Sequence, residues 1–280
     1  MNKQWRKYGF IRLLRNWSGL IGLMLVVVYA IVVIFAETLA PFPPNEQHPA
    51  DRLQPPGAVY RLGTDEFGRD LLSRLIFGAR NSLKVALTSV AAATLTGVTI
   101  GLLAAYLSGM IDNVIMRGID LLFAFPAILL ALFIAAVLGP GERNTIIAIS
   151  VVYLPIFARV GRAAALDVKD REFVDAARSL GAGHLRIIGR HILPNATAPI
   201  IVQVTLALSW GILTEASLSF LGLGVIPPAP SWGGMLSDSR VLMELAPWTV
   251  LTPGLAIMLA ILGFNLLGDG LRDVLDPKLQ

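Results

Sequence analysis

Few side chains in this 280-residue sequence have the types and spacing that catalysis or metal binding requires. The absence of cysteine excludes thiol catalysis, disulfides and thiolate metal sites. The three histidines, His48, His184 and His191, do not form a HExxH pair. A P-loop needs GxxxxGK followed by serine or threonine, and none of the lysines precedes either residue. We therefore expect no catalytic residue, metal or cofactor in this chain, and ATP hydrolysis, if it drives the protein, must come from another subunit.

One polar segment, residues 167–195, lies between two apolar stretches. Phe173, Ala176, Ala177 and Leu180 recur at i, i+3, i+4 and i+7, which predicts one apolar face of a short helix. The other positions are charged: Lys169, Asp170, Arg171, Glu172, Asp175 and Arg178. Gly181 can take the left-handed conformation that ends a helix. The residues alone leave open whether this helix meets another protein or rests on lipid headgroups.

A second short helix is predicted from His184, with Leu185, Ile188 and Ile192 on one side. We expect Pro194 to end it, because proline cannot donate the next helical hydrogen bond.

Glu215 is the clearest ionisable residue within an otherwise uncharged stretch. A charge at membrane depth is by default a functional candidate, here one that lines a path and meets a positively charged amine. The alternative, which we favour, is a structural role in an interhelical hydrogen bond or a position near the outer interface.

The elements that position these residues follow from the charge pattern. Only 15% of the residues are charged, against roughly 25% in soluble domains. Six stretches contain no Asp, Glu, Lys or Arg: 17–36, 85–111, 121–141, 144–158, 191–214 and 245–268. A spanning helix needs about 20 such residues. The sequence therefore predicts an all-α membrane protein with about six transmembrane helices. The first stretch also has the layout of a secretory signal, but it is longer and has no convincing cleavage site.

These stretches divide the chain into five regions. We predict a tail at 1–17, a first transmembrane helix at 18–38, an outer loop at 39–83, a transmembrane core at 84–270 with an inner loop at 163–195, and a tail at 271–280. The basic, aromatic first tail suits an anionic lipid surface, and nucleic-acid binding is its less favoured alternative. The outer loop begins as an extended proline-rich connector, and residues 64–82 predict an amphipathic helix along the interface.

The distribution of basic residues favours an orientation with both ends of the chain in the cytoplasm. The predicted inner segments then hold most of the 23 lysines and arginines. The outer loop does not agree with this orientation, because it is rich in basic residues for an external segment. Residues 38–84 carry six of them: Arg52, Arg61, Arg69, Arg74, Arg80 and Lys84.

Several motifs add a resemblance. Asp175-Ala176-Ala177, Gly181 and His191-Ile192-Leu193-Pro194 resemble the EAA loop of ABC importer permeases, EAA-x3-G-x9-IxLP, with Asp175 in place of glutamate and His191 in place of the common isoleucine. Residues 63–70, 215–224 and 230–233, together with Asp112, Met116, Arg117 and Asp120, resemble the dipeptide/oligopeptide/nickel permease family. The resemblance covers residues 10–280.

The resemblance implies a type I importer subunit in a bacterial inner membrane, with one helix ahead of a five-helix core. Its expected partners are a second homologous permease, two cytoplasmic ATP-binding subunits and an extracytoplasmic binding protein, besides membrane lipid. ATP and magnesium would bind in the ATPase. Residues 172–181 would be the coupling helix, with Glu172, Asp175, Ala176, Ala177, Arg178 and Gly181 meeting the ATPase.

Two other functions stay open from the residues alone. A secondary transporter or channel would act without an ATPase and should show inverted repeats or membrane-embedded coupling charges. A membrane anchor or assembly factor would transport nothing. Within the permease family the cargo also stays open between peptides, nickel, glutathione-like peptides and opines.

Overall fold

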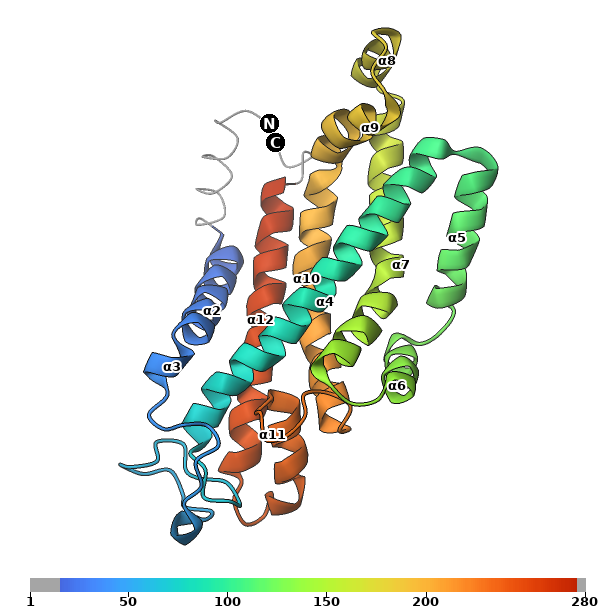
Figure 1. The fold of residues 1–280 in the computed structure, drawn as a ribbon. Coiled ribbons are helices and arrows are strands. Elements are labelled where there is room, and N and C mark those ends of the chain that lie inside the picture. Colours follow the sequence, from blue (N-terminus) through green and yellow to red (C-terminus); the bar gives the residue numbers. More distant parts are fainter. Residues whose placement is uncertain (1–15, 276–280) are drawn as a thin grey trace.

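The computed structural model describes residues 16–275, and within this range the chain is helical and contains no β-strand (Figure 1). The prediction of an all-α protein is confirmed. Five long helices form the body: α2 (Trp17–Ile34), α4 (Leu71–Leu107), α7 (Glu142–Lys169), α10 (Leu193–Phe220) and α12 (Trp248–Leu275). The shorter helices are α3 (Ala36–Leu39), α5 (Gly109–Phe123), α6 (Ala127–Leu138), α8 (Glu172–Ser179), α9 (His184–Arg186) and α11 (Trp232–Ser239), with 3-10 turns at Pro49–Asp51 and Arg240–Leu242 and a π-helical turn at Ile187–Ile192.

The membrane spans agree with the prediction of about six, but one of them is broken. Five helices are long and apolar enough to cross a membrane, and α5 with α6 makes a sixth only as a pair bent by 87°. The third predicted span, 121–141, is therefore not one straight helix. Pro126 explains the break, because it lacks an N–H and disfavours the helical conformation of the preceding Phe125.

For residues 64–82 the sequence predicted a separate interfacial helix. In the structure, most of this stretch is instead the beginning of α4. This helix runs unbroken from Leu71 to Leu107, and its 37 residues give about 55 Å, well beyond a hydrocarbon core of about 30 Å. Its amphipathic first turns can thus extend outside the bilayer as part of the same helix. Gly78 does not interrupt it, since the missing side chain admits the ring of Trp232 from α11.

The ends of the predicted regions shift by a few residues. The first transmembrane helix stops at Ile34, and α3 follows it. Helix α12 continues to Leu275, so the predicted tail at 271–280 begins as helix. Residues 1–15 and 276–280 of the two predicted tails lie outside the described residues. Asn16 donates a 2.7 Å hydrogen bond to Asp273, which brings the start of α2 and the end of α12 to the same end of the bundle.

The proline-rich connector folds back on the start of α4 and is not simply extended. Phe42, His48 and Tyr60 pack their rings together, and Gln54 N–H donates to Thr64 Oγ1 at 2.8 Å. Asp70 then caps α4, with Oδ2 accepting from Ser73 N–H at 2.8 Å.

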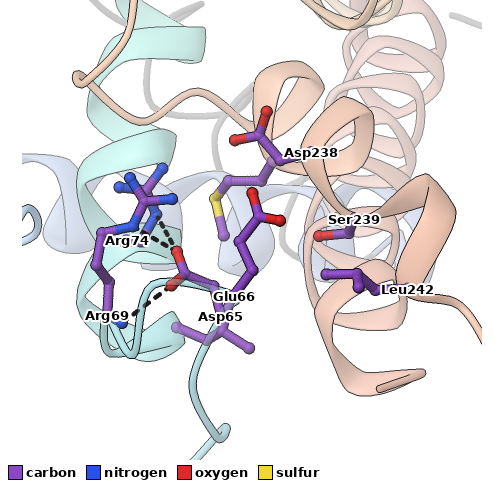
Figure 2. A pocket seen from close by; sticks show the side chains of 9 residues that line it. Asp65, Glu66, Arg69, Arg74, Asp238, Ser239 and Leu242 are labelled. Atoms are coloured by element: carbon purple, nitrogen blue, oxygen red, sulfur yellow. Dashed lines mark hydrogen bonds and ion pairs between the residues drawn. The ribbon is translucent and has the colours of Figure 1, made fainter. Parts of the chain in front are cut away.

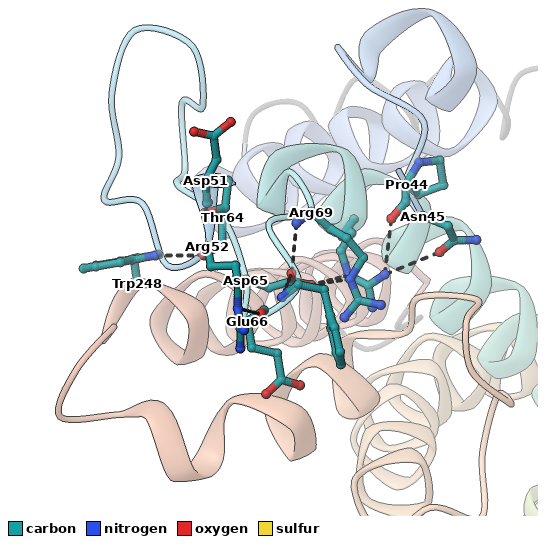
Figure 3. Close-up of polar contacts among 11 residues, drawn as sticks. Pro44, Asn45, Asp51, Arg52, Thr64, Asp65, Glu66, Arg69 and Trp248 are labelled. Carbon is teal, nitrogen blue, oxygen red and sulfur yellow. Dashed lines mark hydrogen bonds and ion pairs between the residues drawn. The ribbon is translucent and has the colours of Figure 1, made fainter. Parts of the chain in front are cut away.

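A charge cluster holds this outer loop together (Figure 3). The Asp65 carboxylate accepts hydrogen bonds from the backbone N–H groups of Phe67 and Arg69, pairs with the Arg69 side chain, and lies 3.4 Å from Arg74 Nε. All three charged side chains are at least nine-tenths buried.

Two further basic residues of this region also have carboxylate partners. Arg80 pairs with Glu37 at 3.0 Å and Lys84 with Glu142 at 2.7 Å. Four of the six basic residues in this loop therefore have a carboxylate partner in the structure.

Replacing Asp65 with alanine is expected to lower the free energy of unfolding by about 3–5 kcal/mol, because it leaves buried arginines without their carboxylate. Thermal unfolding of the purified protein measures the loss. Glu66→Ala is the matched control, since only the backbone carbonyl of Glu66 bonds to Arg52, at 2.6 Å. Equal unfolding temperatures for the two variants would contradict this assignment.

The core of the bundle is the crossing of α4 and α7, where glycines bring the backbones together. A side chain on Gly97 would lie 2.6 Å from the Leu154 carbonyl oxygen, and one on Gly101 would lie 2.7 Å from Arg162 N and collide with the Ala158 carbonyl. Gly161 faces Val98 from the other helix in the same way. Gly97 and Gly101 form a GxxxG pair, the spacing that lets membrane helices pack closely.

Candidate functional site

Helix α8 projects beyond the end of the bundle at which α7 ends and α10 begins (Figure 1). Val174 is fully buried and Ala177 nearly so, and Val174 belongs to the same buried cluster as Ile187 and Ile192 of the π-helical turn. The loop predicted at 163–195 is therefore shorter, because α7 continues through Lys169. Helix α8 packs against the chain that follows it.

The apolar face predicted for this helix is divided in the structure. Of its four members only Ala177 is buried, whereas Phe173 is 40% exposed, Leu180 is 88% exposed and Ala176 is also exposed. The residue that seats α8 on the bundle is Val174, which the i, i+3, i+4 pattern omitted. Most of the predicted face therefore points away from this chain, and an exposed apolar surface beyond a membrane bundle is a candidate contact for another protein.

The charged residues of α8 are exposed. Asp175 Oδ1 accepts a 3.0 Å hydrogen bond from Arg178 Nη1 one turn later, and both side chains are more than half exposed. Glu172 lies in the first turn and is exposed. A surface pair of this kind contributes at most about 1 kcal/mol, so Asp175 can exchange it for another cation at little cost.

The helix ends as Gly181 predicted. Gly181 has φ +79°, its N–H donates to the Arg178 carbonyl at 3.0 Å, and the next N–H, of Ala182, reaches back to Ala177 at 3.0 Å. These two bonds form a Schellman motif, which needs a residue without side-chain strain in the left-handed region. The predicted left-handed turn is confirmed.

Two polar contacts brace this region against the end of α4. The Tyr106 hydroxyl and His184 Nδ1 are 2.6 Å apart, and their rings meet edge to face. Lys169 Nζ donates to Ser108 Oγ at 2.8 Å and to the Ala105 carbonyl at 3.2 Å. Because Lys169 ends α7 and His184 begins α9, a displacement of α8 would reach α4, α7 and α10 together.

Pro194 does not end the second short helix, contrary to the sequence prediction. The chain is helical from His184 through Phe220, and Pro194 lies in the first turn of α10. The preceding π-helical turn explains the continuity, because Leu193 N–H bonds to Ile188 five residues back and the wider turn makes room for the proline ring. The Asn195 side chain donates to the His191 carbonyl at 2.7 Å.

Glu215 lies in α10 and is fully buried. Its Oε1 accepts a 2.7 Å hydrogen bond from Ser219, one turn further along the same helix, and Oε2 has no hydrogen-bonding partner among residues 16–275. This bond is within α10, but Ser82 of α4 also faces the carboxyl group from a second helix, so the structural interpretation, an interhelical hydrogen bond or a position near the outer interface, stays a prediction. The side chain is enclosed in this conformation, and whether it lines a path stays a prediction.

A small pocket at the opposite end of the bundle belongs to the outer charge cluster (Figure 2). Asp65, Arg69 and Arg74 line one side of it, and Asp238 from α11 lines the other. Burial raises the pKa of Asp238, while the nearby Arg74 and Arg69 oppose the rise. The arginines of this pocket already face carboxylates of the same chain, so it is part of the packing between the outer loop and α11.

The described residues contain no group of three or more His, Asp or Glu side chains that could hold a metal ion. The α8 region offers an exposed apolar face, flanking charges, and an attachment to long helices that polar contacts brace.

Comparison with known proteins places the chain among transport permeases. Residues 97–280 match the family described as binding-protein-dependent transport system inner membrane component. Residues 3–56 match the N-terminal transmembrane domain of oligopeptide transport permease C.

Curated relatives span nearly the whole chain. A dipeptide transport system permease protein, DppC, of Alkalihalophilus pseudofirmus is 48% identical over 99% of this chain and 90% of its own length. A glutathione transport system permease protein, GsiD, of Pectobacterium atrosepticum is 42% identical over 99% of this chain and 92% of its own. A chain of the inward-facing MetNI methionine ABC transporter shares the fold, with a TM-score of 0.59 and 19% identity over 72% of this chain and 96% of that one.

Proposed function

Since this chain belongs to the family of binding-protein-dependent transport system inner membrane components, we propose that it forms half of a translocation path for peptides. It is a permease component of an ABC importer and a multi-pass membrane protein. The proposed partners are a second homologous permease, which completes the path, two cytoplasmic ATP-binding subunits, which bind ATP and magnesium, and an extracytoplasmic binding protein.

The observation that supports the proposal best is the exposed apolar face of α8. Phe173, Ala176 and Leu180 present it beyond the end of the bundle. In the proposed complex this face docks in a groove of an ATPase, where the small Ala176 allows close approach and Asp175 meets a basic group. The Schellman turn at Gly181 then directs the chain back into the bundle.

The proposed mechanism is alternating access driven by the ATPases. Their closure on ATP displaces α8, and the contacts of Lys169 and His184 pass the displacement to α7, α4 and α10. The helices then rock between inward-open and outward-open arrangements. In this proposal α8 and both ends of the chain are in the cytoplasm, and the charge cluster with α11 faces outward, toward the binding protein.

Peptides are the proposed cargo because the relatives include transporters named for dipeptides and for di- and tripeptides. Glutathione, itself a small peptide, is named for other relatives. The external binding protein would select among these, and this chain would admit what it delivers.

Copurification followed by reconstitution tests the proposal. We expect this chain to purify with a second permease and two ATP-binding subunits, and the complex in proteoliposomes to take up a radiolabelled dipeptide only with ATP and the binding protein. Omitting the binding protein is the matched control. Uptake by this chain alone, driven by an ion gradient, would support a secondary transporter and contradict the proposal.

A further inference from the structure

The elbow between α5 and α6, residues 120–129, interrupts a membrane span by a sharp bend, and most of its residues are exposed. Ala124, Phe125 and Pro126 join the two helices at the 87° bend, and all three are exposed. The exposure continues into α6, where Leu129 is 58% exposed. Neither helix could span a bilayer alone, because their 15 and 12 residues give only about 22 and 18 Å.

The elbow lies near the middle of the bundle. Helix α5 starts beside Lys169, at the end that carries α8, and descends by about 22 Å before it breaks. The neighbouring α7 is about 42 Å long, so the break falls roughly halfway along it. In Figure 1, α5 lies beside α7, and α6 turns away from the direction of α5 and lies next to the lower end of α7.

The backbone of this elbow is unsuited to lipid. The N-terminus of α6 has no side-chain cap, so its first N–H groups have no partner within the helix. In hydrocarbon each unsatisfied backbone group costs several kcal/mol, and exposed irregular backbone occurs at membrane depth only where protein or water covers it.

The side chains near the elbow support the same conclusion. Arg159 of α7 pairs with Asp120 of α5 at 2.6 Å and lies over the Phe123 ring, yet its side chain is 46% exposed and that of Asp120 is 56% exposed. Half-exposed charges deep in a membrane face protein or a water-filled cavity.

Helix α2 shows what a lipid-facing surface of this chain looks like. Residues 17–34 carry no charged side chain, the helix is unbroken, and Met24, Val28 and Ile31 are each about half exposed. Its inner side packs on α12 through Gly22 and Gly263. Exposure alone therefore does not distinguish the two surfaces, whereas the broken backbone and the exposed ion pair do.

We propose that the elbow at residues 120–129 lines the water-filled translocation path, near the membrane midplane, on the side that the second permease completes. The inference rests on the proposed function and adds the segment that substrate passes. In secondary transporters, discontinuous helices with free N–H groups at the midplane form the substrate site, which shows that such backbone can line an aqueous path.

Single cysteines test this directly, because the chain contains none of its own. Leu129→Cys probes the elbow, and Val28→Cys on α2 is the matched lipid-facing control, with native exposures of 58% and 53%. Val59→Cys in the outer loop, 67% exposed in the native protein, gives the rate in water. The assembled transporter in lipid nanodiscs is treated with a charged methanethiosulfonate, which reacts only with hydrated thiolate, and modification of this chain is followed by mass.

We expect Leu129→Cys to react at least tenfold faster than Val28→Cys. Trapping the transporter with ATP and vanadate should change the modification rate of Leu129→Cys at least threefold and leave that of Val59→Cys unchanged. Phe125→Cys repeats the test if Leu129→Cys does not assemble. A rate equal to that of Val28→Cys, or one that trapping leaves unchanged, would overturn the proposal while ATP-driven uptake stands. Absence of ATP-driven uptake by the unsubstituted complex would instead refute the proposed function.

Discussion

Replacing Gly101 with alanine is expected to lower the free energy of unfolding by about 3 kcal/mol, one of the largest effects of adding a single methyl group to this protein. The new Cβ would meet the Ala158 carbonyl and lie 2.7 Å from Arg162 N, both backbone atoms of α7. A flexible side chain could turn away, but here the two helices must separate along their whole crossing. Thermal unfolding of the purified protein and its yield from membranes measure the effect.

Gly118→Ala is the control that isolates this steric cause. Gly118 lies within α5 and has open space where a Cβ would be placed. The same change of residue should there be neutral or stabilise by up to about 1 kcal/mol, since alanine is the better helix former. If both variants unfolded at the same temperature, the close α4–α7 crossing would not describe the folded protein.

The features that could be predicted from sequence are those that local composition determines. Uncharged stretches of sufficient length predicted the spans, because a bilayer excludes charges whatever the neighbouring helices do. The turn at Gly181 was also predictable, since a glycine that follows an amphipathic stretch commonly ends the helix in the left-handed conformation.

The features that were missed depend on contacts between distant segments. Periodicity grouped Phe173, Ala176 and Leu180 into one apolar face, but it could not tell that the chain seats α8 by Val174 and leaves that face outside. Charge counting noted the basic residues of the outer loop, whereas the pairing of Arg69 with Asp65, of Arg80 with Glu37 and of Lys84 with Glu142 appears only in the folded chain.

Proline shows the same limit at two places. Pro126 interrupts a predicted span, while Pro194, which was expected to end a helix, is accommodated by the π-helical turn before it. The residue type predicts a missing hydrogen bond in both cases. Whether the chain bends or absorbs the loss depends on the surrounding turn, which the sequence pattern did not resolve.

Replacing Ala176 with arginine is expected to reduce ATP-driven uptake at least about fivefold without unfolding the permease. Ala176 is exposed on α8, so the larger side chain costs this chain nothing in packing. In the proposed complex it would enter the close contact with the ATPase, where overpacking costs about 1–3 kcal/mol, and each 1.4 kcal/mol is a tenfold change in affinity. Uptake into proteoliposomes and substrate-stimulated ATP hydrolysis measure the loss of coupling.

Ser179→Arg is the matched control, because Ser179 is exposed on the polar side of the same helix and the added charge and volume are identical. Ala177→Arg is a poorer test, since Ala177 is only 9% exposed and its replacement would disturb the seating of α8 itself. A structural role for Ala176 would lower the unfolding temperature together with uptake, whereas a coupling role lowers uptake alone. Full uptake by Ala176→Arg, with Ser179→Arg equally active, would show that the exposed face of α8 is not the surface that meets the ATPase.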